Sequence, residues 1–480
     1  MSTNRYLLFG IVSLGMLLAS MQGSMIGVAF SDIGEGLNAP DRWVSWVIAI
    51  FTLAQAVSMP ISGKLSDELG RRTVFASGVS LFLVASVVCA ASPNIYVLIA
   101  ARAMQGLAGG SLLPSAYGII GDAFDTQSRA QAIGMLSSVF PIGSIIGPNV
   151  GGVIVDHFGW RWTFLMNVPL GLLVVAAALI FMQGAAQRRR QPIDFAGAAL
   201  LSLAVTSLVY ALTELAASGR GGGSVNPVIV TGAVIASVVA GLLFLRHESR
   251  TPEPLLELQL LRRREFAFTN ALNFFYGVVV FGLFSFVPLY AQTGYDMSES
   301  ESGLLLTPRA IGMIAASSLS SLLLVRSGYR KPIIIGMLGM GVTLLIMSFG
   351  IHEPTVAGFN LSDFTYLALI TGFSGIFFGI SGPAANNAAL ELAPDRIAAI
   401  TGLRGMFRMI GGAIGTSLIA LVISRSSSRQ EGLEIAFVGL AVAAVLVSFL
   451  VVGIPDRVGA RSAAPEPARE PSAQPAGGDG

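Results

Sequence analysis

Charged side chains inside long apolar segments are the residues of this chain whose types and spacing could do chemistry. Arg102 and Gln105 lie one helical turn apart in one apolar run. Arg309 lies in a second run, and Arg404 and Arg408 lie four residues apart in a third. A guanidinium buried in such a run costs on the order of several kcal/mol unless it faces protein or water. The pattern indicates either a coupling or conformational site or arginines that tie helices together through carbonyls, and the sequence leaves both readings open.

A charged turn is the second candidate site. It reads Gly63-Lys-Leu-Ser-Asp67-Glu-Leu-Gly70-Arg71-Arg72 and separates two apolar runs. Gly63 and Gly70 remove side chains where helices pass closely. Asp67 can accept hydrogen bonds from the free N–H groups at the start of a neighbouring helix, and the two arginines can pair with it or with lipid phosphate. We interpret the turn as a latch between two moving parts rather than as an ordinary cationic loop.

A glycine-rich segment is the third candidate. It contains Gly143, Gly147, Pro148, Gly151 and Gly152. Glycines four residues apart make a flat helix face for close contact, and a proline inside a helix removes a hydrogen bond and kinks it. We expect this segment both to pack closely and to serve as a surface on which helices rock.

Polar and thioether side chains inside apolar runs are candidates for lining a substrate cavity. They are Gln22, Met25, Asn149, Asn270, Asn273, Asn386 and Asn387. Polar groups beside adaptable apolar ones suit amphipathic substrates of loose shape. Arginines in the same cavity would disfavour cationic drugs and favour anionic or lipid-like substrates, although Arg408 is also expected simply to pack between helices.

Proton-coupled transport needs a carboxylate that gains and loses its charge inside the cavity. No Asp or Glu lies deep in any apolar run. Asp32 and Glu214, near the ends of runs, are the best candidates, and proton coupling stays open.

The elements that must position these residues follow from composition. Of 480 residues, 53% are apolar and 12% are charged, and the mean hydropathy is +0.73. A soluble protein has about 25% charged residues, so lipid must be the main solvent. Fourteen apolar runs are each long enough to cross ~30 Å of hydrocarbon as a helix. They lie at about 6–30, 43–62, 73–92, 95–120, 130–155, 162–183, 195–217, 226–245, 267–291, 302–325, 332–350, 363–390, 397–424 and 433–453. We therefore predict an all-α membrane protein with fourteen transmembrane helices.

The chain carries a faint internal repeat. Asp67-Glu-Leu-Gly-Arg-Arg72 follows the second run, and Val325-Arg-Ser-Gly-Tyr-Arg-Lys331 follows the tenth. Each places a glycine just before cationic residues. The offset equates runs 1–6 with runs 9–14 and leaves two inserted helices, a layout typical of transporters whose halves rock about a central site. The predicted parts are two pseudo-symmetric six-helix bundles, 1–184 and 267–453, an inserted pair at 185–266, and a disordered Pro/Ala/Gly-rich tail at 454–480.

Cationic residues mark the expected cytoplasmic loops. They include Arg188-Arg189-Arg190, Arg262-Arg263-Arg264 and Arg330-Lys331, which all fall in alternate loops. The positive-inside rule then places both termini in the cytoplasm. We expect a multi-pass protein of a bacterial-type inner membrane, in contact with the lipid bilayer and monomeric.

Several classes of chemistry find no support in the sequence. The single cysteine, Cys89, and three widely spaced histidines give no metal site. A phosphate-binding loop and a nucleophile constellation are both missing, so we expect no enzyme activity, no cofactor and no nucleic-acid partner.

The charged turn, Arg102-x-x-Gln105-Gly106 and the glycine-rich segment, in this order, resemble the major facilitator superfamily. Trp160-Arg-Trp-x-Phe-x-x-Asn167-x-Pro-x-Gly171 is similar to a run of its fourteen-span drug:proton antiporter branch. The resemblance implies alternating access. It also implies that Asp67 latches to the inner start of a helix in its own or the other half, with an outward-facing preference when closed. Gln22 stands where the branch usually carries an acid, and Gly27 where an Asn is common.

The expected function is export of amphipathic small molecules, as in multidrug efflux, with proton antiport. One alternative is export of lipids or lipid-like anions with weak or no proton coupling, which Gln22 and the buried arginines favour. A second alternative is a membrane sensor or scaffold that transports nothing.

Overall fold

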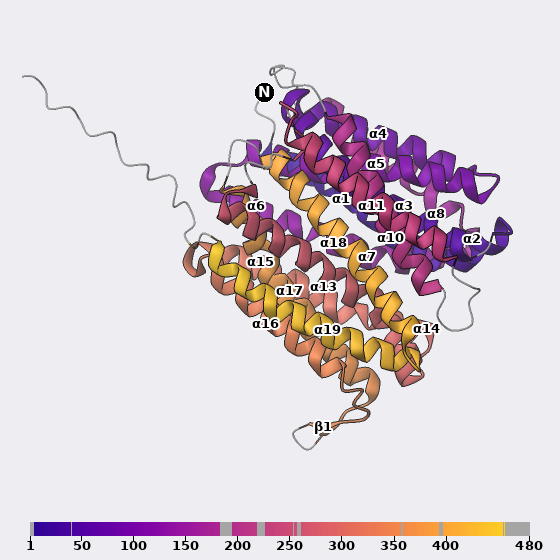
Figure 1. The fold of residues 1–480 in the computed structure, drawn as a ribbon. Helices are drawn as coiled ribbons and strands as arrows, with labels where there is room; N and C mark the ends of the chain where they lie inside the picture. The colour runs from indigo at the N-terminus through magenta and orange to yellow at the C-terminus, as the bar shows by residue number, and fades with distance from the viewer. Residues whose placement is uncertain are drawn as a thin grey trace, which may run out of the picture.

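Helices make up nearly all of the computed structural model, which describes residues 4–39, 41–182, 194–217, 226–252, 254–256, 261–356, 359–392, 397–454 and 456 (Figure 1). The first part of the chain forms α1 Arg5–Val28, α2 Phe30–Gly36, α3 Asp41–Glu68, α4 Arg71–Ala90, α5 Ile95–Ala123, α6 Thr126–Ser137, α7 Val139–Phe158, α8 Trp162–Leu165 and α9 Asn167–Phe181. Next come α10 Phe195–Ala217 and α11 Pro227–Glu248. The last part forms α13 Arg264–Tyr295, α14 Glu299–Leu304, α15 Leu306–Ser327, α16 Arg330–Met347, a hairpin of β1 Thr355–Val356 and β2 Phe359–Asn360, α17 Asp363–Leu390, α18 Ile397–Arg425, α19 Arg429–Leu450 and a terminal 3₁₀ turn, Val451–Gly453.

Thirteen helices among the described residues are long and apolar enough to cross a membrane. The remaining predicted span corresponds to α15, whose 22 residues extend about 33 Å at ~1.5 Å per residue. It is less apolar because it carries Arg309 and a run of serines, and one of these, Ser320, donates to the Ile380 carbonyl of α17 at 2.8 Å. The predicted all-α, multi-spanning fold is confirmed. Because α15 is long enough to cross, we propose it as the fourteenth span.

Several predicted spans are divided or extended. The fifth is interrupted at Ser138 between α6 and α7, although α7 itself runs on through Pro148. The sixth consists of α8 and α9, and the tenth takes in α14 and α15. The ninth reaches from Arg264 to Tyr295, well past the predicted limits of 267–291. Apolar runs mark what lies in lipid, whereas helices continue into the interfacial layer.

Local sequence explains the helix ends. Asn94 caps α5 by accepting from Tyr96 N and Val97 N at 3.1 and 3.0 Å. Ser298 and Glu301 form a capping box at the start of α14. Gly70 precedes α4 with φ +93°, a backbone conformation that glycine adopts without strain.

Two bundles pack side by side, one built by α1 and α3–α9 and the other by α13–α19 (Figure 1). The inserted helices α10 and α11 pair with each other, and α10 also packs against α3 and α18. We propose the predicted boundaries 1–184, 185–266 and 267–453 for these parts. The cations at 188–190, and the predicted disordered tail apart from Ile454 and Asp456, lie outside the described residues.

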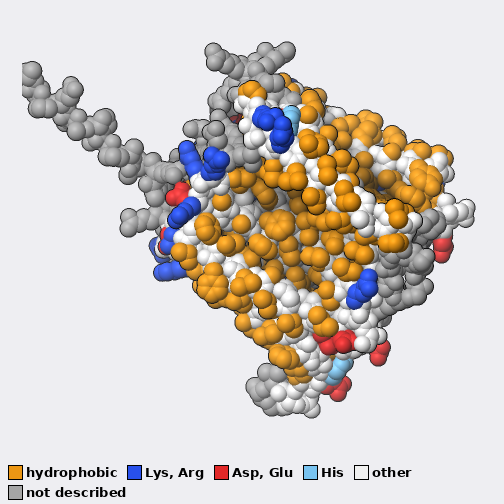
Figure 2. Space-filling model, in the orientation of Figure 1, with side chains coloured by type: hydrophobic (Ala, Val, Ile, Leu, Met, Phe, Trp, Pro, Cys, Tyr) orange, Lys and Arg blue, Asp and Glu red, His pale blue; other side chains and the backbone are white. Residues whose placement is uncertain are grey.

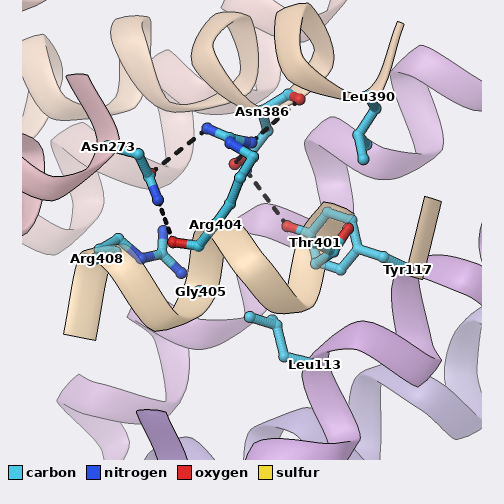
Figure 3. Close-up of a pocket in the computed structure, with 9 residues that line it drawn as sticks. All are labelled: Leu113, Tyr117, Asn273, Asn386, Leu390, Thr401, Arg404, Gly405 and Arg408. Carbon is cyan, nitrogen blue, oxygen red and sulfur yellow. Dashed lines mark hydrogen bonds between the residues drawn. The ribbon is translucent and has the colours of Figure 1, made fainter. Parts of the chain in front are cut away.

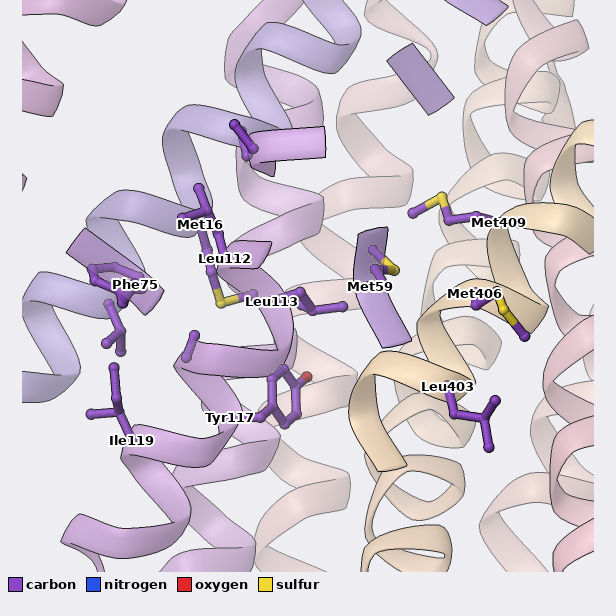
Figure 4. Close-up of a cluster of buried hydrophobic side chains, with 14 of the residues drawn as sticks. Met16, Met59, Phe75, Leu112, Leu113, Tyr117, Ile119, Leu403, Met406 and Met409 are labelled. Atoms are coloured by element: carbon purple, nitrogen blue, oxygen red, sulfur yellow. The ribbon is translucent and has the colours of Figure 1, made fainter. Parts of the chain in front are cut away.

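The largest buried apolar cluster contains residues of both bundles. Figure 4 shows Met59 of α3 between Leu113 of α5 and Met406 of α18. Lipid tails are as apolar as these side chains, so van der Waals fit rather than escape from water holds the helices together. Flexible thioethers fill irregular gaps between such helices.

The surface divides by side-chain type (Figure 2). Apolar side chains cover the broad middle of the visible face. Lys and Arg gather toward the end that carries α6, whereas Asp and Glu lie mostly toward the end that carries α14 and the β1–β2 hairpin. This distribution is typical of a protein embedded in a bilayer with a cationic side and an acidic side.

Candidate functional site

The predicted latch turn joins α3 to α4 and is fastened inside the first bundle by its two arginines. Arg71 pairs with Asp67, and its Nε donates to Asp122 Oδ2 at the end of α5 at 3.0 Å. Arg72 donates to the Leu179 carbonyl of α9 at 2.7 Å. The turn is therefore held to α5 and α9 as well as to its own helices.

Asp67 also reaches the second bundle. The backbone N–H of Ala399, in the first turn of α18, lies beside the Asp67 carboxylate. The first turn of a helix presents unpaired N–H groups and the positive end of the helix dipole, so a carboxylate is stabilised there. The structure thus places Asp67 beside a helix start, and the part that this contact plays in transport stays a proposal.

Glycines bring the bundles close beside this contact. A Cβ at Gly402 of α18 would lie 2.2 Å from the Met59 carbonyl oxygen of α3. A Cβ at Gly121 of α5 would lie 2.6 Å from the Ile397 side chain. Gly63 itself is buried in α3. No larger side chain fits at Gly402 without moving the helices apart, whereas at Gly121 the end of the Ile397 side chain would have to shift. These glycines therefore permit close contact between the bundles.

A cavity of about 70 Å³ lies between the bundles. The first bundle contributes residues from α1, α5, α6 and α7, and the second contributes residues from α13, α15, α17 and α18. Its polar lining consists of Tyr117, Ser137, Asn273, Tyr276, Ser317, Asn386 and Arg408. A smaller void of about 10 Å³ shares several of these residues and adds Thr401 and Arg404 (Figure 3).

One polar link crosses the cavity from bundle to bundle. Asn386 of α17 donates to Ser137 Oγ of α6 at 3.0 Å and to the Tyr117 hydroxyl of α5 at 3.4 Å. The Tyr117 and Ser137 oxygens lie 2.9 Å apart. Hydrogen bonds of this kind hold two surfaces in register and exchange readily for water or a ligand.

Arg404 is buried at this link, with 4% of its surface exposed. Its Nη1 donates to the side-chain and backbone oxygens of Asn386 at 2.9 and 3.2 Å, and its Nη2 lies 3.5 Å from Asn273 Oδ1. Asn273 in turn donates to the Arg404 carbonyl. Figure 3 shows Asn273 and Asn386 on either side of the guanidinium. The asparagines satisfy hydrogen bonds without neutralising the charge.

Arg408 lies one turn further along α18 and lines both voids. None of the residues that line them is an Asp or a Glu. Close packing fixes the helix here, since a Cβ at Gly277 of α13 would lie 2.1 Å from the Arg408 carbonyl oxygen. Two guanidinium groups therefore share an acid-free cavity.

Arg102 occupies a different environment and is fully buried within the first bundle. It donates to the Val47 carbonyl at 3.0 Å and to Gln105 Oε1 at 2.7 Å, and it stacks over the Phe51 ring. Gln105 Nε2 in turn donates to Ser86 Oγ at 2.7 Å. These contacts favour the structural interpretation, in which Arg102 ties α3, α4 and α5 together.

Arg309 is also buried, in α15, and does not line the described voids. Its helix lies against α17, where a Cβ at Gly375 would lie 1.8 Å from the Arg309 carbonyl oxygen. Its position indicates helix packing rather than contact with a ligand in this conformation.

The glycine-rich segment of α7 packs against α1. Cβ atoms at Gly143 and Gly147 would lie 2.7 Å from Ser20 Cβ and 2.1 Å from Ser24 Oγ, and one at Gly151 would lie 3.3 Å from Met25. Gly152 has only Val28 nearby, at 3.9 Å. Glycines at four-residue spacing thus form a flat contact face inside the first bundle, and its use as a rocking surface stays a prediction.

Of the residues predicted to line the cavity, Asn273 and Asn386 do so in this conformation. Gln22 is buried and accepts from Asn167, and Met25 packs against Gly151. Asn149 is exposed on α7. Asn270 and Asn387 donate back to carbonyls of their own helices at 2.9 and 3.0 Å. A single sequence cannot tell an amide that faces a cavity from one that is satisfied by its own helix.

The two carboxylates proposed for proton coupling lie away from the cavity. Asp32 is exposed in the first turn of α2, and Glu214 is half-buried near the end of α10. Neither lines the described voids.

Sequence reasoning missed two groups. Tyr117, Ser137 and Tyr276 line the cavity, but hydroxyls in apolar helices are too common to single out. Asp194 lies beside His247 at 2.7 Å, at the base of the inserted helices. Burial acts to raise the pKa of Asp194, but hydrogen bonds from Gly197 N–H and from His247 bring this pKa below its usual value.

Comparison with known proteins agrees with this architecture. The sequence profile of the Major Facilitator Superfamily matches residues 12–308 and 270–477. The chain is 31% identical to the multidrug transporter protein MdtP of Bacillus subtilis over 429 residues, 89% of this chain and 77% of that protein. It is 30% identical to multidrug resistance protein 3 of the same organism over 472 residues, 97% of this chain and 88% of that protein.

A solved structure shares the fold. The crystal structure of the human organic anion transporter MFSD10 (TETRAN) aligns with a TM-score of 0.66 over 93% of this chain and 99% of that one, at 16% identity. At that identity the likeness concerns the fold alone. The profile match and the bacterial relatives, together with two bundles around a central cavity, confirm the resemblance seen in the sequence. The chain is a multi-pass membrane protein that belongs to the major facilitator superfamily of transporters.

Proposed function

We propose that the protein is a secondary active transporter that exports amphipathic small molecules by alternating access. The observation that carries this proposal is the central cavity, which both bundles line and which contacts between the bundles close. Asp67 reaches Ala399 across the bundle interface, and Asn386 reaches Ser137 and Tyr117. Relatives named as a multidrug transporter and a multidrug resistance protein support export of small molecules.

The size of the cavity supports a moving mechanism. About 70 Å³ holds a few water molecules, whereas drug-sized ligands occupy pockets of roughly 300–1,000 Å³. The bundles must therefore separate to admit a substrate. Met16, Phe140, Met313 and Phe378 form much of the apolar wall, and their soft side chains can adapt to different shapes.

The proposal includes an orientation and an energy source. The cationic end of the molecule, which carries the latch, faces the cytoplasm of a bacterial-type inner membrane together with both termini. Protons are the proposed counter-ion, because the sequence offers no phosphate-binding loop for ATP. Asp32 and Glu214 are the candidate proton carriers, and their distance from the cavity implies that coupling acts through helix movement. A monomer suffices, because one chain supplies both bundles.

Proteoliposomes test this function directly. Purified protein is reconstituted, a pH gradient is imposed, and movement of a fluorescent amphiphile is followed. We expect the dye to accumulate against its concentration gradient. This accumulation should stop when a protonophore collapses the pH gradient. Transport that does not depend on the pH gradient would rule out proton antiport. If no amphiphile is transported, a role as a sensor or scaffold would be favoured.

A further inference from the structure

We infer that the central cavity binds the anionic group of its substrate at Arg404 and Arg408, so that the transported class is amphipathic anions. Such a molecule carries a carboxylate, sulfonate or phosphate on an apolar body. The inference rests on the proposed transport function and names the substrate class for the same cavity.

Charge balance is the first argument. Arg404 is 4% exposed, and Arg408 lies four residues away on the same helix, so the two cations repel each other. The cavity lining contains no carboxylate to offset them. Arg404 Nε also has no hydrogen-bond partner among the described residues. An unpaired buried charge is costly, and an anion that enters between the bundles would remove much of that cost.

Preorganisation is the second argument. Asn273 and Asn386 hold the Arg404 guanidinium from α13 and α17, and glycines lock α18 onto α13. A Cβ at Gly411 would lie 2.1 Å from the Phe274 carbonyl oxygen, which shows how closely these helices approach. Fixed donors around a desolvated site bind an anion more strongly than mobile donors in water.

Contrast with Arg102 is the third argument. Arg102 is equally buried and its Nη2 also lacks a partner, but Arg102 stacks on Phe51, bonds to a carbonyl and to Gln105, and lines neither void. Both α18 arginines instead line the smaller void, together with Tyr117, and Arg408 also lines the larger void beside Tyr117 and Tyr276. A helix-packing role alone does not require two cations at the surface where the bundles separate.

The shape of the cavity completes the substrate description. Apolar groups from both bundles, among them Met16, Phe140 and Phe378, surround the polar centre. An apolar body would pack against these side chains while its charged group sits at α18. The anionic group could belong to a free small molecule or to a lipid headgroup, and the experiment must separate these sources.

Binding to the full chain in nanodiscs of neutral phosphatidylcholine tests the inference. Three probes share one aromatic body: 2-naphthalenesulfonate, 2-naphthylmethanol and 2-naphthylmethyl-trimethylammonium. Calorimetric titration should show the sulfonate binding at least about tenfold more tightly than the ammonium probe, with affinity falling as salt rises. Equal affinity of the three probes for the unmodified protein would overturn the inference.

Substitutions locate the site. R408Q should weaken sulfonate binding by about tenfold or more and leave the neutral probe unchanged, and R404K should lose less affinity than R404Q. R425Q, at the exposed end of the same helix, is the matched control and should bind like the unmodified protein. Because R404Q removes contacts to two asparagines, its thermal unfolding is measured alongside. Undiminished sulfonate binding in R408Q, whose fold does not rely on those contacts, would contradict the inference.

A lipid arm separates the two sources of the anion. Replacing part of the phosphatidylcholine with phosphatidylglycerol should leave sulfonate affinity within about twofold if the site takes free amphiphiles. If phosphatidylglycerol competes strongly with the sulfonate and R408Q abolishes this competition, the same site binds an anionic lipid headgroup. That result would still support anion binding. Transport of cationic or neutral amphiphiles with no preference for anions would leave the proposed function standing and reject this inference.

Discussion

Two turns at the cationic end of the molecule, one in each bundle, share several contacts and differ one turn before their glycines. Arg72 follows Gly70 and caps the end of α9 through the Leu179 carbonyl. Arg330 follows Gly328 at the same spacing and caps the end of the last helix, donating to the Val452 and Ile454 carbonyls at 2.9 and 2.7 Å. Both glycines have positive φ, +93° and +69°.

The residues directly before these two arginines also make matching contacts. Arg71 bonds to Asp122 at the end of α5, and Tyr329 donates to Glu391 at the end of α17 at 2.6 Å. The difference lies one turn earlier, where Asp67 lies beside the Ala399 N–H of the other bundle and the residue at the matching position is the aliphatic Val325. The shared contacts brace each bundle internally, whereas the Asp67 carboxylate also lies beside the other bundle. From this asymmetry we propose that one turn is a latch and the other is a brace.

The largest effect is expected where α18 meets α3 beside the latch. Gly402→Val should abolish transport, by about a hundredfold or more, because a Cβ there would meet the Met59 carbonyl oxygen at 2.2 Å and hold the bundles apart. The measurement is dye export per folded protein. Gly439→Val is the matched control, since no atom lies within 4 Å of a Cβ there. Export by Gly402→Val at the control rate would show that this seal is not needed.

The second prediction concerns the latch carboxylate. Asp67→Asn keeps the size of the side chain and removes the charge that the start of α18 stabilises, so export should slow by about tenfold while the protein stays folded. Glu68→Gln removes the neighbouring charge and should change the rate by less than about twofold. If the two variants export equally well, the contrast between latch and brace fails.

The third prediction concerns the brace. Arg330→Gln removes two donors to backbone carbonyls and should lower the free energy of unfolding by about 1–2 kcal/mol, because charged hydrogen bonds at a partly exposed site contribute that much. Export per folded molecule should not change. Lys331→Gln, at the exposed neighbouring residue, should not change the thermal unfolding temperature. Slower export by folded Arg330→Gln would make this turn part of the moving mechanism.

The smallest effect is expected at Tyr329. Burial and the Glu391 carboxylate raise the pKa of Tyr329, so the phenol keeps its proton and donates at neutral pH. Tyr329→Phe should lower the free energy of unfolding by about 0.5–1.5 kcal/mol, measured by denaturation in detergent. Tyr6→Phe, on an exposed residue, should cost nothing measurable. Slower export per folded molecule by Tyr329→Phe would contradict a purely bracing role.

The sequence predicted the fold better than the site, for a physical reason. Apolar length sets which segments cross a bilayer, so the spans could be counted, and the turn at Asp67 could be recognised from its charges. Asn386 faces the cavity, whereas Asn387 bonds to its own helix. This difference depends on how the helix is rotated about its axis. A helix that is apolar on every face carries no sequence pattern that specifies this rotation. The link from Asn386 to Tyr117 joins residues far apart in the chain and needed the packed structure.

The most direct test of the account is the distance between the inner ends of the two bundles. Spin labels at Thr73 of α4 and Arg326 of α15, both exposed, report it by pulsed electron resonance. We expect one short distance in the unmodified protein and a second, longer population in Asp67→Asn. Identical distance distributions in the two proteins would contradict the claim that Asp67 holds the bundles closed.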